Sequence, residues 1–160
     1  MRFEDIKMLD TEKVKDFMLA LVKAPELQPA NGISYCNISA KRVAEFFGCD
    51  DFSAPDMLAD EMVHTMIISG DWTFTTFGEI VAKWAQMGGL AFAGMTSDEL
   101  GEEHGHIAPV FPGIPELSPS LGIPVPQLAN VGAKNGVMLA SEAFPVAKWP
   151  LGYYLWKLSI

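Results

Sequence analysis

Two side chains in this 160-residue chain, one cysteine and one histidine, have the types and positions needed for nucleophilic chemistry. Cys36 opens an expected helix, CNISAKRVAEFFG, directly after a glycine-containing loop. The N-terminus of a helix has free backbone N–H groups and partial positive charge, which favour a thiolate and can stabilise an oxyanion. Cys36 is therefore a candidate nucleophile, although a free cysteine is more often a small buried core residue.

His106 is the candidate base for that nucleophile. It lies in GHIAPVFPG, at the start of an expected strand. A strand edge that faces a helix N-terminus would bring imidazole and thiol together, and histidine exchanges protons near neutral pH. Taken singly, each residue is better explained as structural, but the order of a helix-opening Cys36 and a strand-opening His106 favours a catalytic pair.

Two segments of the chain resemble the catalytic segments of the NlpC/P60 and CHAP peptidoglycan hydrolases. SYCNISAKRVAEFFG resembles their nucleophile segment, and GHIAPVFPG resembles their Gly-His-(Ile/Val)-Ala-x-Val base segment. The resemblance covers about residues 33–145. It implies a papain-like order in which a cysteine opens a helix, a sheet follows, a histidine opens a strand, and a polar residue on the next strand orients the imidazole.

The orienting residue has two candidates on the next expected strand, PVPQLANVG. Such a group accepts the second ring N–H of the histidine and fixes its tautomer. Gln127 and Asn130 are three positions apart, so on a regular strand they face opposite sides of the sheet. We favour Asn130, because a short amide on a sheet is less readily explained as a solvated surface group. Gln127 is the alternative.

Other polar residues near Cys36 have weaker claims. Tyr35 and Asn37 flank it, and either could bind the scissile carbonyl oxygen or a substrate amide. Packing of Tyr35 and a helix-start hydrogen bond of Asn37 explain them equally well. Asp60 and Glu61, on a later helix, are interpreted as solvated acids.

No cofactor or metal is predicted. His104 and His106 are two residues apart with acidic residues nearby, but a zinc hydrolase requires three converging ligands and Gly105 suggests a turn. No P-loop or G-x-G-x-x-G pattern is present. The formal net charge of −9, from 11 Lys+Arg and 20 Asp+Glu, argues against binding nucleic-acid phosphates or an anionic membrane surface. No apolar run is long enough to span a bilayer.

The pattern of apolar residues and turns predicts an α+β fold, with N-terminal helices packed on a mostly antiparallel sheet. A helix of residues 12–24 would be capped by Thr11. Further helices are expected at residues 36–47, 54–69 and 76–87. Strands are expected at residues 90–95, 106–111, 126–131, 136–140 and 153–160. Asn135-Gly136 indicates a hairpin, and residues 112–124 form a Pro-rich loop.

We expect one catalytic domain over residues 1–160, with an N-terminal helical extension (1–30), the papain-like core (33–145) and a C-terminal strand (150–160). Cys36 and Cys49 are expected at opposite ends of one helix, about 18 Å apart at ~1.5 Å per residue, which is too far for a disulfide.

The resemblance implies amide hydrolysis of a peptidoglycan peptide through a thioester, as in an endolysin, a wall-remodelling enzyme or a secreted effector. The start, MRFEDIKMLDTEKVKDF, has acids and no apolar core typical of a signal peptide. We therefore expect synthesis in the cytoplasm and action on the wall after export or lysis, with a secretion machine, holin or immunity protein as partner. The alternatives are a papain-like thiol hydrolase or acyltransferase on a non-wall substrate, and a catalytically silent structural or partner-binding domain.

Overall fold

The computed structural model describes residues 8–157, so the last three residues of the strand expected at 153–160 lie outside the described part. Four helices of nine or more residues appear near the four expected positions. The helices are α1 (Thr11–Lys23), α2 (Cys36–Phe46), α3 (Ala59–Ile68), α4 (Gly78–Gln86), α5 (Ser97–Leu100) and α6 (Ala140–Ala143), with 3-10 turns η2 (Pro25–Leu27) and η3 (Val146–Lys148).

All strand pairs in the described residues are antiparallel. The strands are β1 (Trp72–Thr75), β2 (Ala91–Met95), β3 (His106–Pro109), β4 (Glu116–Leu117), β5 (Pro124–Val125), β6 (Gln127–Asn130), β7 (Gly136–Leu139) and β8 (Tyr153–Trp156). The main sheet has the order β1-β8-β2-β3, and β4-β5 and β6-β7 form separate pairs. A bridge between Val110 and Leu128 joins the β6-β7 pair to β3.

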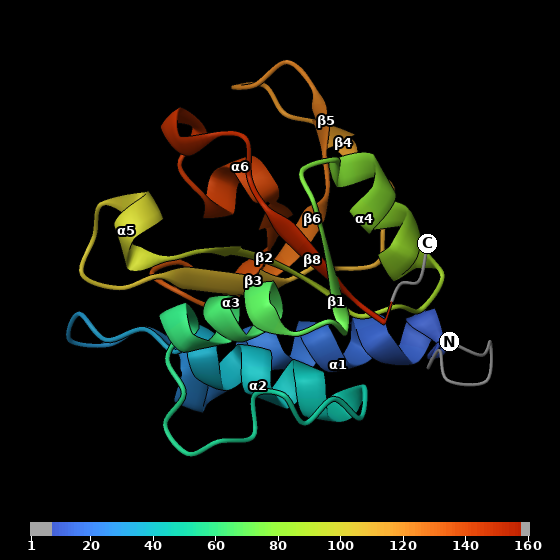
Figure 1. Cartoon of the computed structure of the whole chain (residues 1–160). Helices are drawn as coiled ribbons and strands as arrows, with labels where there is room; N and C mark the ends of the chain where they lie inside the picture. The colour runs from blue at the N-terminus through green and yellow to red at the C-terminus, as the bar shows by residue number, and fades with distance from the viewer. Residues whose placement is uncertain (1–7, 158–160) are drawn as a thin grey trace.

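The sheet lies between two groups of helices (Figure 1), which confirms the α+β class and the antiparallel sheet. Helices α1, α2 and α3 pack on one face, where their buried side chains join Phe92 and Ile107 in one hydrophobic cluster. Helices α4 and α6 pack on the other side around Ala93, Leu128 and Leu155. The helix predicted as an N-terminal extension thus packs in the same cluster as α2.

The starts of α1 and α3 differ from the sequence prediction, and α4 begins two residues later than expected, at Gly78. The carboxylate of Asp10, rather than Thr11, caps α1 by accepting the N–H of Glu12 at 2.9 Å. Helix α3 begins at Ala59 instead of residue 54, because Asp56 has a φ of 58° and interrupts helical geometry.

The predicted hairpin between β6 and β7 is present, but its connection is residues 131–135 and not a two-residue turn. The side chain of Asn135, the last residue of this loop, makes two hydrogen bonds that fix the loop. Its Oδ1 accepts the N–H of Gly132 at 2.9 Å, and its Nδ2 donates to the carbonyl of Leu27 at 2.8 Å. The side chain therefore ties the loop after Asn130 to the segment that follows α1.

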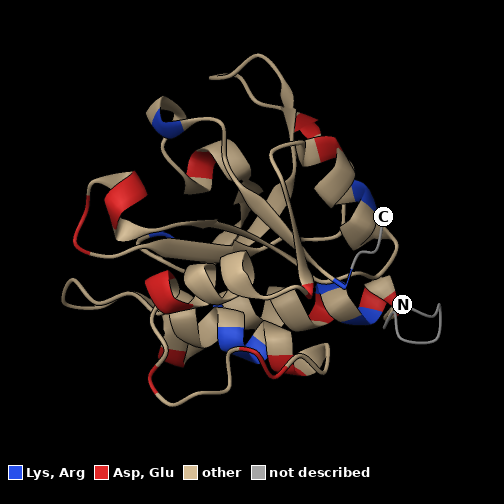
Figure 2. Cartoon of the chain, viewed as in Figure 1, with Lys and Arg blue, Asp and Glu red and all other residues tan. Residues whose placement is uncertain are grey.

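Charged residues lie on the outer surfaces of helices and loops (Figure 2). The two side-chain ion pairs found in residues 8–157, Lys15–Glu12 and Arg42–Glu26, are exposed and contribute little to stability. None of the described helices combines the length and the apolar character that crossing a membrane requires.

Candidate active site

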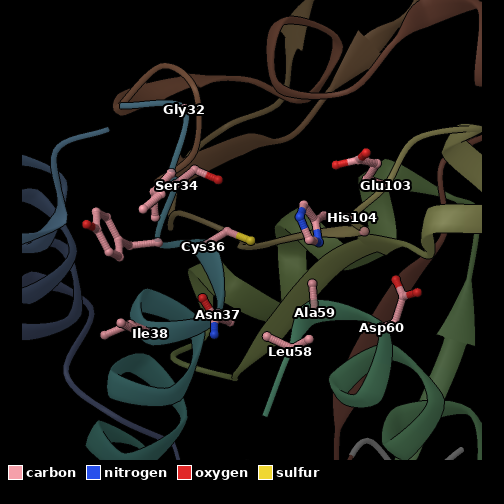
Figure 3. Close-up of a pocket in the computed structure, with 13 residues that line it drawn as sticks. Gly32, Ser34, Cys36, Asn37, Ile38, Leu58, Ala59, Asp60, Glu103 and His104 are labelled. Atoms are coloured by element: carbon pink, nitrogen blue, oxygen red, sulfur yellow. The ribbon is translucent and has the colours of Figure 1, made fainter. Parts of the chain in front are cut away.

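Cys36 is the first residue of α2, and Tyr35 precedes it as the cap residue without a capping side chain. Cys36 as a whole residue is 8% exposed, and α2 packs closely on β3 through the fully buried Ala40 and Val43. Small and branched residues at these positions allow the helix to approach the strand. This packing places the thiol against the strand that His106 opens, and Figure 3 shows the sulfur pointing out of α2 into a cavity.

The Cys36 sulfur has backbone hydrogen-bond donors on two elements. The N–H groups of Cys36 and Asn37 reach it from the helix start, and the N–H of Ile107 reaches it from β3. These donors stabilise a thiolate, but burial has the larger effect and raises the pKa of the Cys36 thiol above its usual 9.0. The N–H groups at the helix start lower this pKa as expected, but desolvation outweighs them, so the net shift is upward.

Asn130 on β6 holds the imidazole of His106, which is on β3, through a side-chain hydrogen bond. The Nε2 of His106 lies 2.7 Å from the Oδ1 of Asn130, while the Nδ2 of Asn130 donates to the carbonyl of Lys134 at 2.7 Å. Because the amide nitrogen is committed to Lys134, its oxygen accepts from an Nε2–H of the imidazole. That tautomer leaves Nδ1 unprotonated, which is the form a general base needs.

The surroundings of the imidazole keep it neutral. Burial lowers the pKa of His106 below 6.5, and the opposing effects of Asn130 and Glu102 are smaller. One face of the ring packs against Phe144, with ring centroids 4.8 Å apart. Gly132 lies beside the ring, where an added Cβ would come within 3.0 Å of the imidazole Cε1. His106 is thus held rigidly as a neutral imidazole.

The other predicted site residues have different positions. Gln127 is away from His106, since its Nε2 donates to the carboxylate of Glu116 at 3.3 Å and lies beside Gly113. The Nδ2 of Asn37 donates to the carbonyl of Met57 at 3.0 Å, which ties α2 to the segment before α3. Tyr35 packs against the hydrophobic cluster, and both residues that flank Cys36 line its cavity.

Two cavities meet at the candidate pair. The first, about 440 Å³, is lined by Cys36, and the second, about 500 Å³, is lined by His106 and Asn130. Four residues line both cavities and form the ridge between them, namely Ser34, Glu103, His104 and Gly105. Sequence reasoning missed this ridge, because all four residues precede Cys36 or His106 in loops without a local pattern.

Asp60 holds one side of the ridge and is not the solvated acid that the sequence suggested. Its Oδ1 accepts the N–H of Ser97 at 2.8 Å, and its Oδ2 accepts the Ser97 hydroxyl. A Cβ added to Gly105 would overlap Asp60 Oδ1 and lie 2.8 Å from the carbonyl of Met95. The glycine before His106 is therefore required, because Asp60 fills the space of a side chain.

Metal-ligand geometry is absent from the described residues: no group of three or more His, Cys, Asp and Glu side chains within 8–157 converges on one point. His104 is exposed on the ridge and faces the Cys36 cavity (Figure 3), whereas His106 is directed to Asn130.

No family model matches the chain, and no curated protein matches it. The functional interpretation therefore depends on the geometry of Cys36, His106 and Asn130, and on the two sequence segments that contain the cysteine and the histidine.

Proposed function

We propose that the chain is a cysteine hydrolase that cuts an amide bond through a thioester, with a papain-like arrangement of its catalytic residues. One observation carries the proposal. The hydrogen bond between His106 Nε2 and Asn130 Oδ1 leaves Nδ1 as a proton acceptor, next to a strand residue, Ile107, whose N–H contacts the Cys36 sulfur. A nucleophile, a base and an orienting amide are the components of such a site.

The first step of the proposed reaction is acylation of Cys36. The Sγ of Cys36 attacks the amide carbonyl carbon while its proton passes to Nδ1 of His106. Backbone N–H groups at the start of α2 stabilise the oxyanion. The C–N bond then breaks, the amine leaves with the proton from His106, and the acyl group remains on Cys36 as a thioester.

Deacylation uses the same residues in reverse. His106 removes a proton from water, the resulting hydroxide attacks the thioester carbonyl, and the thiol leaves with the proton that His106 returns. The acid product carries the oxygen of the water, so the reaction is balanced without a further reagent.

The directions of the two pKa shifts define the resting state. The pKa of Cys36 is raised and that of His106 is lowered, both by burial, so each group is neutral at neutral pH. The thiolate is therefore formed during the attack, with His106 as general base, and is not stored as an ion pair. Asn130 stabilises the imidazolium that appears transiently through the charge-assisted bond to Nε2.

The proposed substrate is a peptidoglycan peptide, which comes from the resemblance of the segments around Cys36 and His106 to the NlpC/P60 and CHAP hydrolases. The placement of the imidazole at the start of β3 and of its amide partner on β6 supports this choice, because the same order of elements characterises those hydrolases. The chain would then act on the wall after export or lysis.

Digestion of purified peptidoglycan tests the proposal. We expect the wild type to release new amino groups or amines and Cys36→Ala to release none, while Cys49→Ala serves as the matched control for loss of a buried thiol. Equal release by wild type and Cys36→Ala contradicts the mechanism. Cys36-dependent cleavage of peptides without cleavage of the wall polymer points instead to a papain-like hydrolase with a non-wall substrate.

A catalytically silent domain is the second candidate, and the burial of Cys36 favours it. A cysteine that is 8% exposed and has a raised pKa resembles a core cysteine more than an activated one. The two candidates differ in one property: a silent domain forms no acyl adduct on Cys36 with any activated ester.

A further inference from the structure

The two cavities can be matched to the two halves of a substrate, an inference that rests on the proposed function. In acylation the carbonyl carbon becomes bonded to the Cys36 sulfur, so the acyl half lies on the Cys36 side. The leaving amine receives its proton from His106, so the amine half lies on the His106 side. The cavity lined by Cys36 is then the acyl site, and the cavity lined by His106 and Asn130 is the amine site.

Apolar side chains are exposed in the acyl site. Ile33 is 56% exposed, Ile38 39% and Leu58 54%, and all three line the cavity that contains Cys36. They come from the loop before α2, from α2 itself and from the residue before α3. Leu58 lies beside Ala59 on one wall near the Cys36 sulfur (Figure 3). An apolar ligand group that covers this surface removes it from water, and this burial contributes favourably to the free energy of binding.

The charges of the acyl site are all of one sign. Asp60 and Glu103 line it, and none of its lining residues is Lys or Arg. Acidic segments lie at the start of α3 and in the loop after α5 (Figure 2). Asp60 is already bonded to Ser97, so it has little capacity to accept a proton donor from a ligand. A carboxylate bound here would meet like charge without a Lys or Arg to pair with, whereas the amine site includes Lys134 together with Glu102, Glu103 and Glu142.

We infer that the enzyme selects substrates whose acyl half is apolar and uncharged, with Leu58 and Ile33 as specificity-determining residues. An acyl half that carries a carboxylate is disfavoured, because no Lys or Arg lines the cavity to compensate for its desolvation. The resemblance is compatible with two wall bonds, a stem-peptide bond and the amide that joins muramic acid to alanine. The second has an uncharged acyl group and meets the charge part of this rule, although its sugar is polar.

Two esters with the same leaving group test the inference, p-nitrophenyl hexanoate and the p-nitrophenyl monoester of adipic acid. Both acyl chains have six carbons, and they differ in a terminal methyl against a terminal carboxylate. Release of p-nitrophenolate gives kcat/KM for each after subtraction of the rate with Cys36→Ala. We expect the wild type to prefer the hexanoate by about 10-fold or more.

Charge substitutions sharpen the test. Leu58→Lys supplies a cation to the cavity and should reduce the preference by roughly 2- to 5-fold, an effect that salt weakens. Ile33→Lys makes the same change from the loop before α2 and should act in the same direction. Ile67→Lys is the matched control, since Ile67 is 57% exposed on α3 and lines neither cavity.

The outcomes separate this inference from the proposed function. If release depends on Cys36 but the wild-type ratio of kcat/KM for the hexanoate to that for the adipate monoester is one or lower, the proposed specificity is wrong. The proposed hydrolase activity is then still supported. Equal changes in Leu58→Lys and Ile67→Lys also overturn the role of Leu58. Release that does not depend on Cys36 for either ester contradicts the hydrolase itself, and the inference fails with it.

Discussion

The two ends of α2 each have a cysteine, and the comparison between them separates a candidate nucleophile from a core residue. Cys36 starts the helix and Cys49 follows its C-terminal end, and both are buried thiols without a disulfide. Burial raises the pKa of both, and that of Cys49 rises to about 12. Burial and pKa direction alone therefore do not distinguish a functional thiol from a structural one.

The groups that face each sulfur make the difference. Cys36 opens into a cavity, receives N–H donors from α2 and β3, and lies next to the strand of His106. Cys49 is 1% exposed, and the carboxylates of Asp51 and Asp50 add to its raised pKa. The positive end of the helix dipole is at Cys36 and the negative end at Cys49, so a thiolate is stabilised at the first and opposed at the second.

Removal of each thiol gives the largest contrast. We expect Cys36→Ala to lose about 10⁴-fold or more in kcat/KM, because no other group can form the thioester. Cys49→Ala should keep activity within about 2-fold, and lose roughly 0.5–3 kcal/mol of unfolding free energy from a core cavity. Rates of ester cleavage and urea denaturation measure the two effects. A Cys49→Ala enzyme as inactive as Cys36→Ala would remove the distinction.

Loss of the base should have the second-largest effect. His106→Ala is expected to lower kcat by about 10²- to 10⁴-fold, since Cys36 then has no proton acceptor. Asn130→Ala should lower kcat less, by roughly 10²-fold or below, because it disturbs only the orientation of the imidazole. Steady-state rates as a function of pH check both. An unchanged kcat in His106→Ala would contradict the role of His106.

The position before His106 should show a smaller effect. In Gly105→Ala the new methyl group overlaps Asp60 Oδ1, so the ridge between the cavities must move and carry His106 with it. We expect about a 10- to 100-fold loss of kcat, with roughly 1–3 kcal/mol of stability lost. Gly70→Ala is the matched control, because nothing lies within 4 Å of the site of its Cβ. Equal behaviour of the two variants would show that the ridge is not rigid.

The alkaline limb of the stability curve should show the smallest effect. The folded chain holds the Cys49 proton up to a pKa of about 12, while the unfolded chain releases it near 9.0. The unfolding free energy is therefore complete below pH 9 and decreases above it, by up to about 1.4 kcal/mol per pH unit for this thiol. Cys49→Ala should decrease less steeply between pH 9 and 11. Identical slopes in chemical denaturation would contradict the raised pKa.

Local sequence patterns predicted the positions of the candidate pair. The apolar stripe from Cys36 through Ala40 and Val43 predicts a helix that starts at the cysteine, and the structure begins α2 there. The run after His106 predicts a strand, and β3 starts at that residue. Asn130 was preferred over Gln127 because a short amide on a sheet is less readily explained as a solvated surface group, and the structure brings Asn130 to His106.

Features that depend on distant parts of the chain were not predicted. The bond between Asp60 and Ser97 joins residues 37 positions apart, and neither has a distinctive local pattern. Strand β1 begins two residues after Gly70 and was not predicted, because its partner strand β8 lies at the other end of the chain. The raised pKa of Cys36 also escaped prediction, because burial depends on the packing of α2 against β3.

Mapping of the acyl adduct tests the central claim most directly. Wild type, Cys36→Ala and Cys49→Ala are mixed briefly with p-nitrophenyl hexanoate, quenched in acid and digested, and the modified residue is found by mass spectrometry. The account predicts a hexanoyl thioester on Cys36 in the wild type and in Cys49→Ala, and no adduct in Cys36→Ala. A native enzyme that stays unmodified at Cys36, or one acylated at Cys49 instead, would contradict it.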